Sequence, residues 1–234
     1  MKLPWTNWDH VIKLDPDKEL PQNVSYEDVC STGTDAIEIG GTTGVTSSKM
    51  EKVIQACCDY GVPIYQEPSS VGAVVHHENL DGYLVPIVLN SDSSAWIVGA
   101  HKEWAKLDPN IMWNSTWVEA YIVLNPDSAV AHYTNADCNQ TPEDVAAYSI
   151  VAENLFKQSI IYIEYSGIFG DPLTVQTAHD ALSSSSLFYG GGITNYESAH
   201  EMKSHSDTIV VGNLLYEKGI SAVKETIRGA KDAS

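Results

Sequence analysis

The sequence predicts an α/β fold in which eight parallel strands and their connecting helices close into a (β/α)₈, or TIM, barrel. Strand-like and helix-like segments alternate along the chain, and its length of 234 residues suits one barrel. No linker, low-complexity tract or strong internal repeat divides the sequence. We therefore expect residues 1–234 to form a single domain. An open, doubly wound parallel sheet uses the same alternation and is the alternative architecture.

Short apolar runs rich in β-branched residues mark the expected strands. They lie at Val11–Leu14, Ala36–Ile39, Val62–Tyr65, Tyr83–Leu89, Ala120–Leu124, Ile160–Ile163, Leu187–Tyr189 and Thr208–Val211. Segments with helical periodicity separate most of these runs. They lie at Ser48–Tyr60, Ser94–Leu107, Pro142–Phe156, Thr174–Ser183, Tyr196–Lys203 and Ala222–Ala230.

The connection after the third strand, Gln66 to Asp81, breaks this alternation. It contains Pro68 and a Val-Val-His-His stretch, and it leaves little room for a full helix with two loops. We expect this crossover to be short or non-helical. His76 and His77 are adjacent, and adjacent residues on a strand point to opposite faces, so we expect exposed loop histidines rather than a metal site.

The charge balance excludes some partners. Thirteen basic residues face 31 acidic ones, which gives a formal net charge of −18. Such a chain repels nucleic acid and anionic membranes, and it has no apolar run of the roughly 20 residues that span a bilayer. No targeting peptide is recognisable, so we predict a cytoplasmic protein. The acidic composition also indicates adaptation to high salt, as in halophilic organisms; an ordinary acidic cytosolic enzyme is the alternative.

Basic residues are scarce where a barrel enzyme would bind phosphate. Arg228 is the single arginine, and Lys157 is the only basic residue between Lys106 and Lys203. A phosphate site in this half must therefore use mainly backbone N–H groups. Glycines follow the seventh and eighth expected strands, at Gly190–Gly192 and Gly212, which is where barrels often bind phosphate. Tight turns without a ligand are the alternative.

Two carboxylates follow expected strands. Asp15 comes directly after the first strand and is a candidate Mg²⁺ ligand, with Thr42 or Thr43 as a neighbouring hydroxyl; a turn before Pro16 is the alternative. Glu164 ends an apolar strand and suits a general base, with a structural salt bridge as the alternative.

These motifs resemble one known family, the geranylgeranylglyceryl phosphate synthases, which has a bacterial branch of heptaprenylglyceryl phosphate synthases. The resemblance runs from about Trp8 to Lys224. It rests on Lys13–Pro16, Gly33–Ala36 with Gly40–Thr42, Tyr162–Gly167, Tyr189–Ile193 and Val211–Asn213. It implies a modified TIM barrel that lacks the third helix, and transfer of a geranylgeranyl group from its diphosphate to the 3-hydroxyl of sn-glycerol 1-phosphate. This Mg²⁺-dependent reaction is an early step of archaeal ether-lipid synthesis.

The resemblance also implies roles for individual residues. The residues expected to bind glycerol phosphate are Lys13, Tyr162, Ile163, Glu164, Tyr165, Ser166, Gly167, Gly192, Gly212 and Asn213. Asp15 and Thr42 are expected to bind Mg²⁺, and Glu164 to accept the proton of the attacking hydroxyl. Archaeal members have a bulky residue near Trp104 and long-chain bacterial members a small one, so Trp104 is expected to limit the prenyl chain; ordinary core packing is the alternative.

Other functions remain open at this point. A long-chain heptaprenyl-type synthase would differ mainly in its donor. A barrel isomerase or aldolase would use the same glycines, and Lys13 would be its Schiff-base lysine. A non-catalytic phosphometabolite-binding protein would not need both Asp15 and Glu164. Peripheral membrane contact and a homodimer are further hypotheses about partners.

Overall fold

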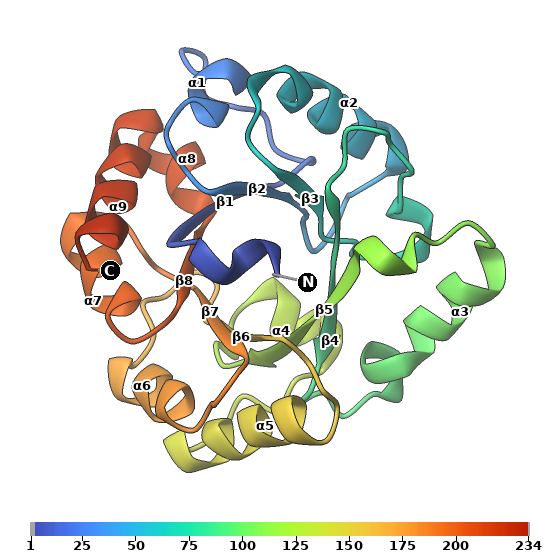
Figure 1. Cartoon of the computed structure of the whole chain (residues 1–234), viewed down its shortest axis with the longest axis vertical. Helices are drawn as coiled ribbons and strands as arrows, with labels where there is room; N and C mark the ends of the chain where they lie inside the picture. Colours follow the sequence, from blue (N-terminus) through green and yellow to red (C-terminus); the bar gives the residue numbers. More distant parts are fainter. Residues whose placement is uncertain (1–2, 234) are drawn as a thin grey trace.

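The computed structural model describes residues 3–233, whose eight strands form a closed parallel barrel (Figure 1). Each strand pairs with the next along the chain, and the last pairs with the first. The strands are β1 (His10–Leu14), β2 (Ala36–Ile39), β3 (Ile64–Gln66), β4 (Gly82–Val88), β5 (Thr116–Val123), β6 (Ile160–Glu164), β7 (Ser186–Gly190) and β8 (Thr208–Val211). The TIM-barrel prediction is confirmed, and the open-sheet alternative is wrong.

Helices surround the barrel (Figure 1). The α-helices are α1 (Tyr26–Cys30), α2 (Ser47–Cys57), α3 (Ala100–Leu107), α4 (Ala129–Thr134), α5 (Pro142–Asn154), α6 (Pro172–Asp180), α7 (Tyr196–Lys203), α8 (Asn213–Lys218) and α9 (Ile220–Asp232). Short 3₁₀ turns are η1 (Pro4–Asn7), η2 (Cys58–Tyr60), η3 (Val71–Ala73) and η5 (Trp113–Ser115), and η4 (Ala95–Gly99) is a π-helical turn that leads into α3. The six expected helices are all present. The sequence prediction missed α1, α4 and α8, which have only five or six residues each and are too short to show a helical period.

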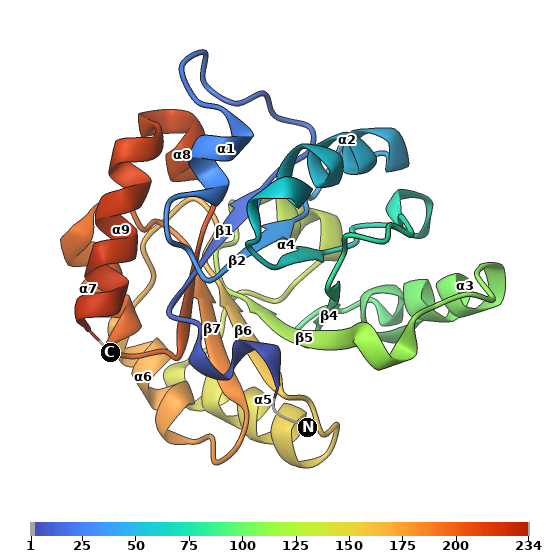
Figure 2. The ribbon, with the colours of Figure 1, turned by 45° about the horizontal axis from the view of Figure 1, so that its top comes forward.

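No α-helix lies between β3 and β4; the turn η3 takes its place. The amide of Gln66 fixes this connection. Its Nε2 donates to the carbonyl of Ala73 (2.7 Å), and its Oε1 accepts from the N–H of Val75 (3.0 Å). The prediction that the third helix is missing is confirmed, and Figure 2 shows the resulting loop between α2 and the projecting helix α3.

Side chains alternate between the barrel interior and the helices, as strand geometry requires. One buried cluster fills the interior and includes Val11, Tyr65 and Phe188. The turn η1 crosses the amino-terminal end of the barrel in Figure 1, and its Trp5 joins the interior cluster, edge-on to Trp117 at 5.4 Å. Aromatic packing therefore closes this end, and the opposite end is left for a site.

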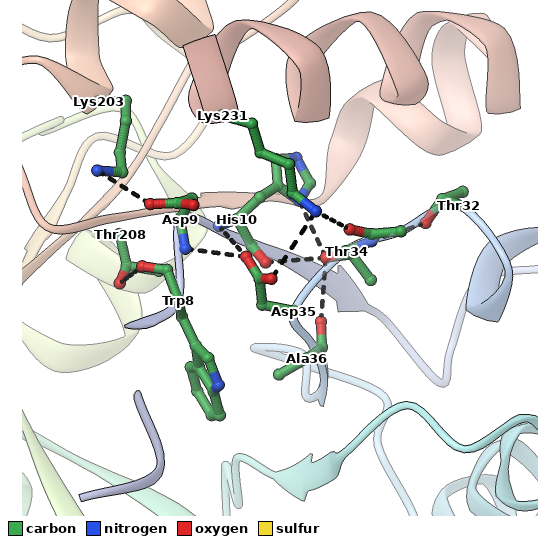
Figure 3. A network of polar contacts seen from close by, with 11 residues as sticks. Trp8, Asp9, His10, Thr32, Thr34, Asp35, Ala36, Lys203, Thr208 and Lys231 are labelled. Carbon is green, nitrogen blue, oxygen red and sulfur yellow. Dashed lines mark hydrogen bonds and ion pairs between the residues drawn. The ribbon is translucent and has the colours of Figure 1, made fainter. Parts of the chain in front are cut away.

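A polar network ties the closed end together (Figure 3). Asp35 accepts the backbone N–H groups of Asp9 (2.9 Å) and His10 (3.0 Å), and Lys231 from α9 lies 3.9 Å from the same carboxylate. The buried ring of His10 lies 3.0 Å from the hydroxyl of Thr34 and 3.1 Å from that of Thr226. The network joins β1 and the start of β2 to the last helix of the chain.

Candidate functional site

A pocket of about 490 Å³ lies at the carboxyl ends of the strands. Its mouth is polar and is formed by residues that follow β1, β2, β6, β7 and β8. Its other half is apolar and is lined by residues of α4, of the loop after β3 and of helix α3. This is the end at which TIM barrels carry their active sites.

The pocket brings together most of the site residues predicted from the sequence. Those that line it are Lys13, Asp15, Thr42, Trp104, Tyr162, Glu164, Ser166, Gly167, Gly192, Gly212 and Asn213. Two members of the predicted set do not line it: Ile163 is buried among the side chains that pack between barrel and helices, and Tyr165 packs against that same cluster. Strand alternation explains the difference, because Tyr162 and Glu164 point inward and Ile163 outward.

The glycine-rich loop after β7 folds against the loop after β6. Gly192 has φ +56°, and a Cβ there would lie 2.1 Å from the backbone nitrogen of Phe169. The hydroxyl of Tyr189 accepts from the N–H of Gly170 (2.8 Å) and donates to the carbonyl of Gly191 (2.9 Å). The close approach at position 192 requires glycine. The two hydrogen bonds of Tyr189 hold the loops together at the mouth.

Lys13 lies at the centre of the polar half. Its Nζ is 2.7 Å from Glu67 and 2.9 Å from Glu38, and it donates to the hydroxyl of Tyr121 at 3.2 Å. Burial alone would lower the pKa of Lys13, but the carboxylates of Glu38 and Glu67 hold it well above its usual range. The ammonium group is therefore charged, and each of its three hydrogens has an acceptor at hand.

Below Lys13, three buried carboxylates meet inside the barrel. Glu38, Glu67 and Glu119 each place an oxygen within 4.8 Å of the others, a spacing that could hold a metal ion. The Lys13 ammonium already contacts two of them, however, so we interpret the cluster as its counter-charge. Burial raises the pKa of Glu38 to about 7 and that of Glu119 well above its usual range, so the cluster retains protons rather than full charge.

Glu38, Glu67 and Glu119 are not among the site residues predicted from the sequence. The sequence feature that could have indicated the cluster is a single charged residue inside each of two apolar strands. These residues are Glu38 in Ala-Ile-Glu-Ile and Glu119 in Trp-Val-Glu-Ala. A charge at such a position faces the interior of a barrel and is costly unless it has a partner.

Glu164 stands at the inner end of the mouth. It is buried and accepts the N–H of Ser166 at 2.6 Å. Burial raises the pKa of Glu164 to about 7, although the nearby Lys13 acts in the opposite direction. A carboxylate with this pKa can take up a proton near neutral pH, which is what a general base must do.

Asp15 and Thr42 place a carboxylate and a hydroxyl in the lining of the pocket, where they could hold a metal ion. Asp15 Oδ1 accepts the N–H of Asp17 (2.9 Å), and a Cβ on Gly41 would lie 2.5 Å from the same oxygen, so the backbone is closely fitted to this carboxylate. Mg²⁺ is typically held by one or two carboxylates together with substrate phosphates and water. One carboxylate and one hydroxyl beside an open pocket fit a metal ion that binds together with a diphosphate.

The apolar half of the pocket ends against Trp104. Valines 71 and 74 from the loop after β3, and Val85 from β4, line this half along with α3. Trp104 is 4% exposed, and its Nε1 donates to Asp108 at 3.0 Å. His76 contacts the same carboxylate oxygen at 2.7 Å. The indole is thus held in one orientation by Asp108, at the end of its own helix. Asp108 is in turn held by His76, from the loop that replaces the third helix.

Comparison with known proteins agrees with this geometry. The model of the PcrB family matches residues 3–230. The chain belongs to the PcrB family. A geranylgeranylglyceryl phosphate synthase of Natronomonas pharaonis is 56% identical over all of both chains. A heptaprenylglyceryl phosphate synthase of Bacillus cereus is 41% identical over 97% of each chain.

Among solved structures, this PcrB-family chain is similar to the (S)-3-O-geranylgeranylglyceryl phosphate synthase of Thermoplasma acidophilum. The TM-score is 0.84 at 23% identity, covering 95% of this chain and 93% of that one. This likeness shows the shared barrel. Together with the closer relatives, it identifies the chain as a prenyltransferase, as the resemblance implied. Within residues 3–233, no helix is both long and apolar enough to cross a membrane.

Proposed function

We propose that this enzyme transfers a geranylgeranyl group from its diphosphate to the 3-hydroxyl of sn-glycerol 1-phosphate, with Mg²⁺. The observation that carries the proposal is the two-sided pocket, whose lining combines a polar mouth with an apolar half. A phosphorylated alcohol and a prenyl tail need these two surfaces side by side. The full-length identity to geranylgeranylglyceryl phosphate synthases supports the same assignment.

The glycerol phosphate would bind at the loops after β6, β7 and β8. Backbone N–H groups around Gly192 and Gly212 suit its phosphate, because the glycines allow close approach. Asn213 and Ser166 extend this polar surface. The resemblance also assigns Lys13 to this substrate; to reach it, the ammonium would have to give up one of its three present partners.

In the transfer, the C–O bond between the prenyl carbon and its diphosphate breaks, and a bond from the glycerol 3-oxygen to that carbon forms. The hydroxyl proton passes to the carboxylate of Glu164, and diphosphate leaves. Asp15 and Thr42 would hold Mg²⁺, which neutralises charge on the leaving diphosphate. The apolar wall keeps water from the prenyl carbon, so that the alcohol rather than water is the nucleophile.

Trp104 favours a donor of geranylgeranyl length over a longer one. The ring packs edge-on against Tyr83 at 5.8 Å and lies 6.0 Å from Trp113, so little space remains behind it for a longer tail. The Bacillus relative, named for a heptaprenyl group, defines the alternative. A longer donor would require this ring to move or to be replaced by a smaller side chain.

The test is an assay of the purified protein with sn-glycerol 1-phosphate and farnesyl, geranylgeranyl or heptaprenyl diphosphate. We expect geranylgeranyl transfer in the presence of Mg²⁺ and its loss with a chelator. Asp15→Asn should need more Mg²⁺ and remain slow. Faster transfer from heptaprenyl diphosphate would support the long-chain alternative, and absence of any transfer would refute the proposal. Trapping of a substrate on Lys13 by borohydride would instead indicate an aldolase.

A further inference from the structure

Helix α3 carries the end wall of the apolar half of the pocket, yet it buries little of its own surface. Within α3, all of which the structure describes, Trp104 is the only buried residue, and Leu107 is 66% exposed. The helix projects from the barrel in Figure 2. A surface helix owes most of its stability to the apolar face that it packs against the core. Because that face is small here, individual contacts of α3 must fix the position of Trp104.

The strand next to α3, β4, has an open edge. It pairs with β5 at six residue pairs, but with β3 at only two, which end at Tyr83. Among the described residues, positions 84–88 therefore have a partner strand on one side only. Pro86 lies in this stretch, and a proline, which has no N–H group, is tolerated at such an edge. Its buried carbonyl still requires a hydrogen-bond donor from another element.

His101 of α3 supplies that donor. Its Nε2 lies 3.1 Å from the carbonyl oxygen of Pro86, and because a carbonyl can only accept, this nitrogen carries the hydrogen. Burial lowers the pKa of the His101 ring, so the ring is neutral near pH 7 and has one N–H to donate. His101 and Trp104 are three positions apart on one face of the helix, and both line the pocket. The hydrogen bond therefore holds the face of α3 that bears Trp104 against β4.

We propose that His101 is a positioning residue that helps to limit the length of the prenyl donor, by fixing α3 and therefore Trp104 against β4. The proposal rests on the proposed function and adds a residue to it. A tail longer than geranylgeranyl requires the indole of Trp104 to move away from the pocket, and α3 carries this indole. That movement breaks the hydrogen bond to Pro86. The bond therefore adds its free energy to the cost of binding a longer donor, and adds nothing to the cost of binding geranylgeranyl diphosphate.

The test measures, by calorimetry with Mg²⁺ and without acceptor, the dissociation constants of geranylgeranyl diphosphate and of the donor that is one isoprene unit longer. His101→Met removes the N–H group at similar size, and His101→Gln keeps an N–H group near the position of Nε2. Lys102→Met, at a side chain of α3 that is 67% exposed, is the control. We expect His101→Met to lower the ratio of the two constants, longer donor over geranylgeranyl, about 2-fold to 10-fold, the worth of one neutral hydrogen bond. His101→Gln and Lys102→Met should keep the ratio of the wild type.

A fall of at least about twofold in His101→Met that His101→Gln does not share supports the proposal. An unchanged ratio, or the same fall in His101→Gln, overturns it. Amide hydrogen exchange of residues 100–107 is measured alongside, and it should be faster in His101→Met than in the wild type. Faster exchange with an unchanged ratio would leave His101 a structural role only, which also overturns the proposal. Because no acceptor is present, a failure to transfer the prenyl group to glycerol phosphate would refute the proposed function and leave this result intact. A wild type that binds neither donor would refute both.

Discussion

The surroundings of Glu164 change the pKa of its carboxyl group. The carboxylate is buried at the end of β6, beside a lysine and a group of further carboxylates. Desolvation dominates these influences and raises the pKa to about 7. An ordinary glutamate would be fully ionised at neutral pH. Because Glu164 is buried, its ionisation instead changes with pH near neutrality.

We predict that kcat/KM rises with pH and levels off above about 7, because only the ionised Glu164 can accept the hydroxyl proton. Glu164→Gln should fold normally, lose about 10²-fold to 10⁴-fold in rate and lose this pH dependence. The exposed Glu143→Gln is the matched control and should keep the wild-type profile. A loss below tenfold in Glu164→Gln would leave Glu164 a positioning role only.

Trp104 is held by the carboxylate of Asp108, which also contacts His76. We predict that Trp104→Ala admits prenyl diphosphates longer than geranylgeranyl, since removal of the ring extends the apolar half of the pocket. Asp108→Asn should shift the preference in the same direction but less, because the indole keeps its bulk and loses its fixed orientation. The measurement is relative kcat/KM across a series of donors. An unchanged preference in a stable Trp104→Ala protein would place the length limit elsewhere.

At the scale of elements, the loops after β6 and β7 depend on each other. Gly192 meets the backbone of Phe169, whereas a Cβ on Gly212 would lie 3.4 Å from the carbonyl of Lys13, an ordinary contact. The two glycines were equivalent in the sequence analysis, since both follow strands at the expected phosphate site. Only the structure shows that one position has space for a methyl group.

We predict different outcomes for alanine at these two glycines. Gly192→Ala combines strained backbone with a clash, which should cost roughly 1–3 kcal/mol, and should lower the thermal midpoint by about 2–10 °C. Gly212→Ala should keep the midpoint and weaken glycerol phosphate binding more than diphosphate binding. Calorimetric melting and titration measure both effects. Equal loss of stability in the two variants would contradict this distinction.

The sequence allowed all eight strands to be predicted because buried parallel strands are continuous apolar runs. It also indicated the missing third helix, because a segment of 16 residues between Gln66 and Asp81 cannot hold a helix with two loops. The short helices α1, α4 and α8 were not predicted. The three carboxylates of Glu38, Glu67 and Glu119 were not predicted either, because they come from β2, the end of β3 and β5 and meet only when the barrel closes.

At the scale of the whole molecule, closure of the barrel joins the two ends of the chain. His10 of β1 contacts Thr226 of α9, 216 positions away in sequence. Burial lowers the pKa of His10 to about 3. The unfolded chain binds this proton near the ordinary pKa of 6.5, so the stabilising contribution is complete above pH 6.5 and is lost as the pH falls toward 3.

We predict that the thermal midpoint of the wild type falls more steeply between about pH 6.5 and pH 4.5 than that of His10→Gln. The mutant lacks the ionisable ring, so its remaining acid sensitivity comes from other groups. His132→Asn changes an exposed histidine and should follow the wild type. Parallel curves for wild type and His10→Gln would show that His10 does not contribute to acid unfolding.

The net charge of −18 affects the whole surface. Raising KCl from about 0.1 M to 1 M shortens the Debye length from about 10 Å to about 3 Å, so repulsion between surface acids weakens. We predict a rise in the thermal midpoint over this range. The double variant Glu51→Gln with Glu143→Gln removes two exposed acids and should show a smaller rise. A midpoint that is insensitive to salt would contradict adaptation to high salt.

The missing third helix changes how two dissimilar reactants can meet. In a complete ring of helices, everything that reaches the catalytic end must arrive through the mouth. Here the valines of the replacement loop, Val71 and Val74, line the same cavity as the glycines at the mouth, so the cavity extends into the sector that a helix would fill. In the proposed reaction, the polar acceptor and the apolar donor would enter this cavity from different sides.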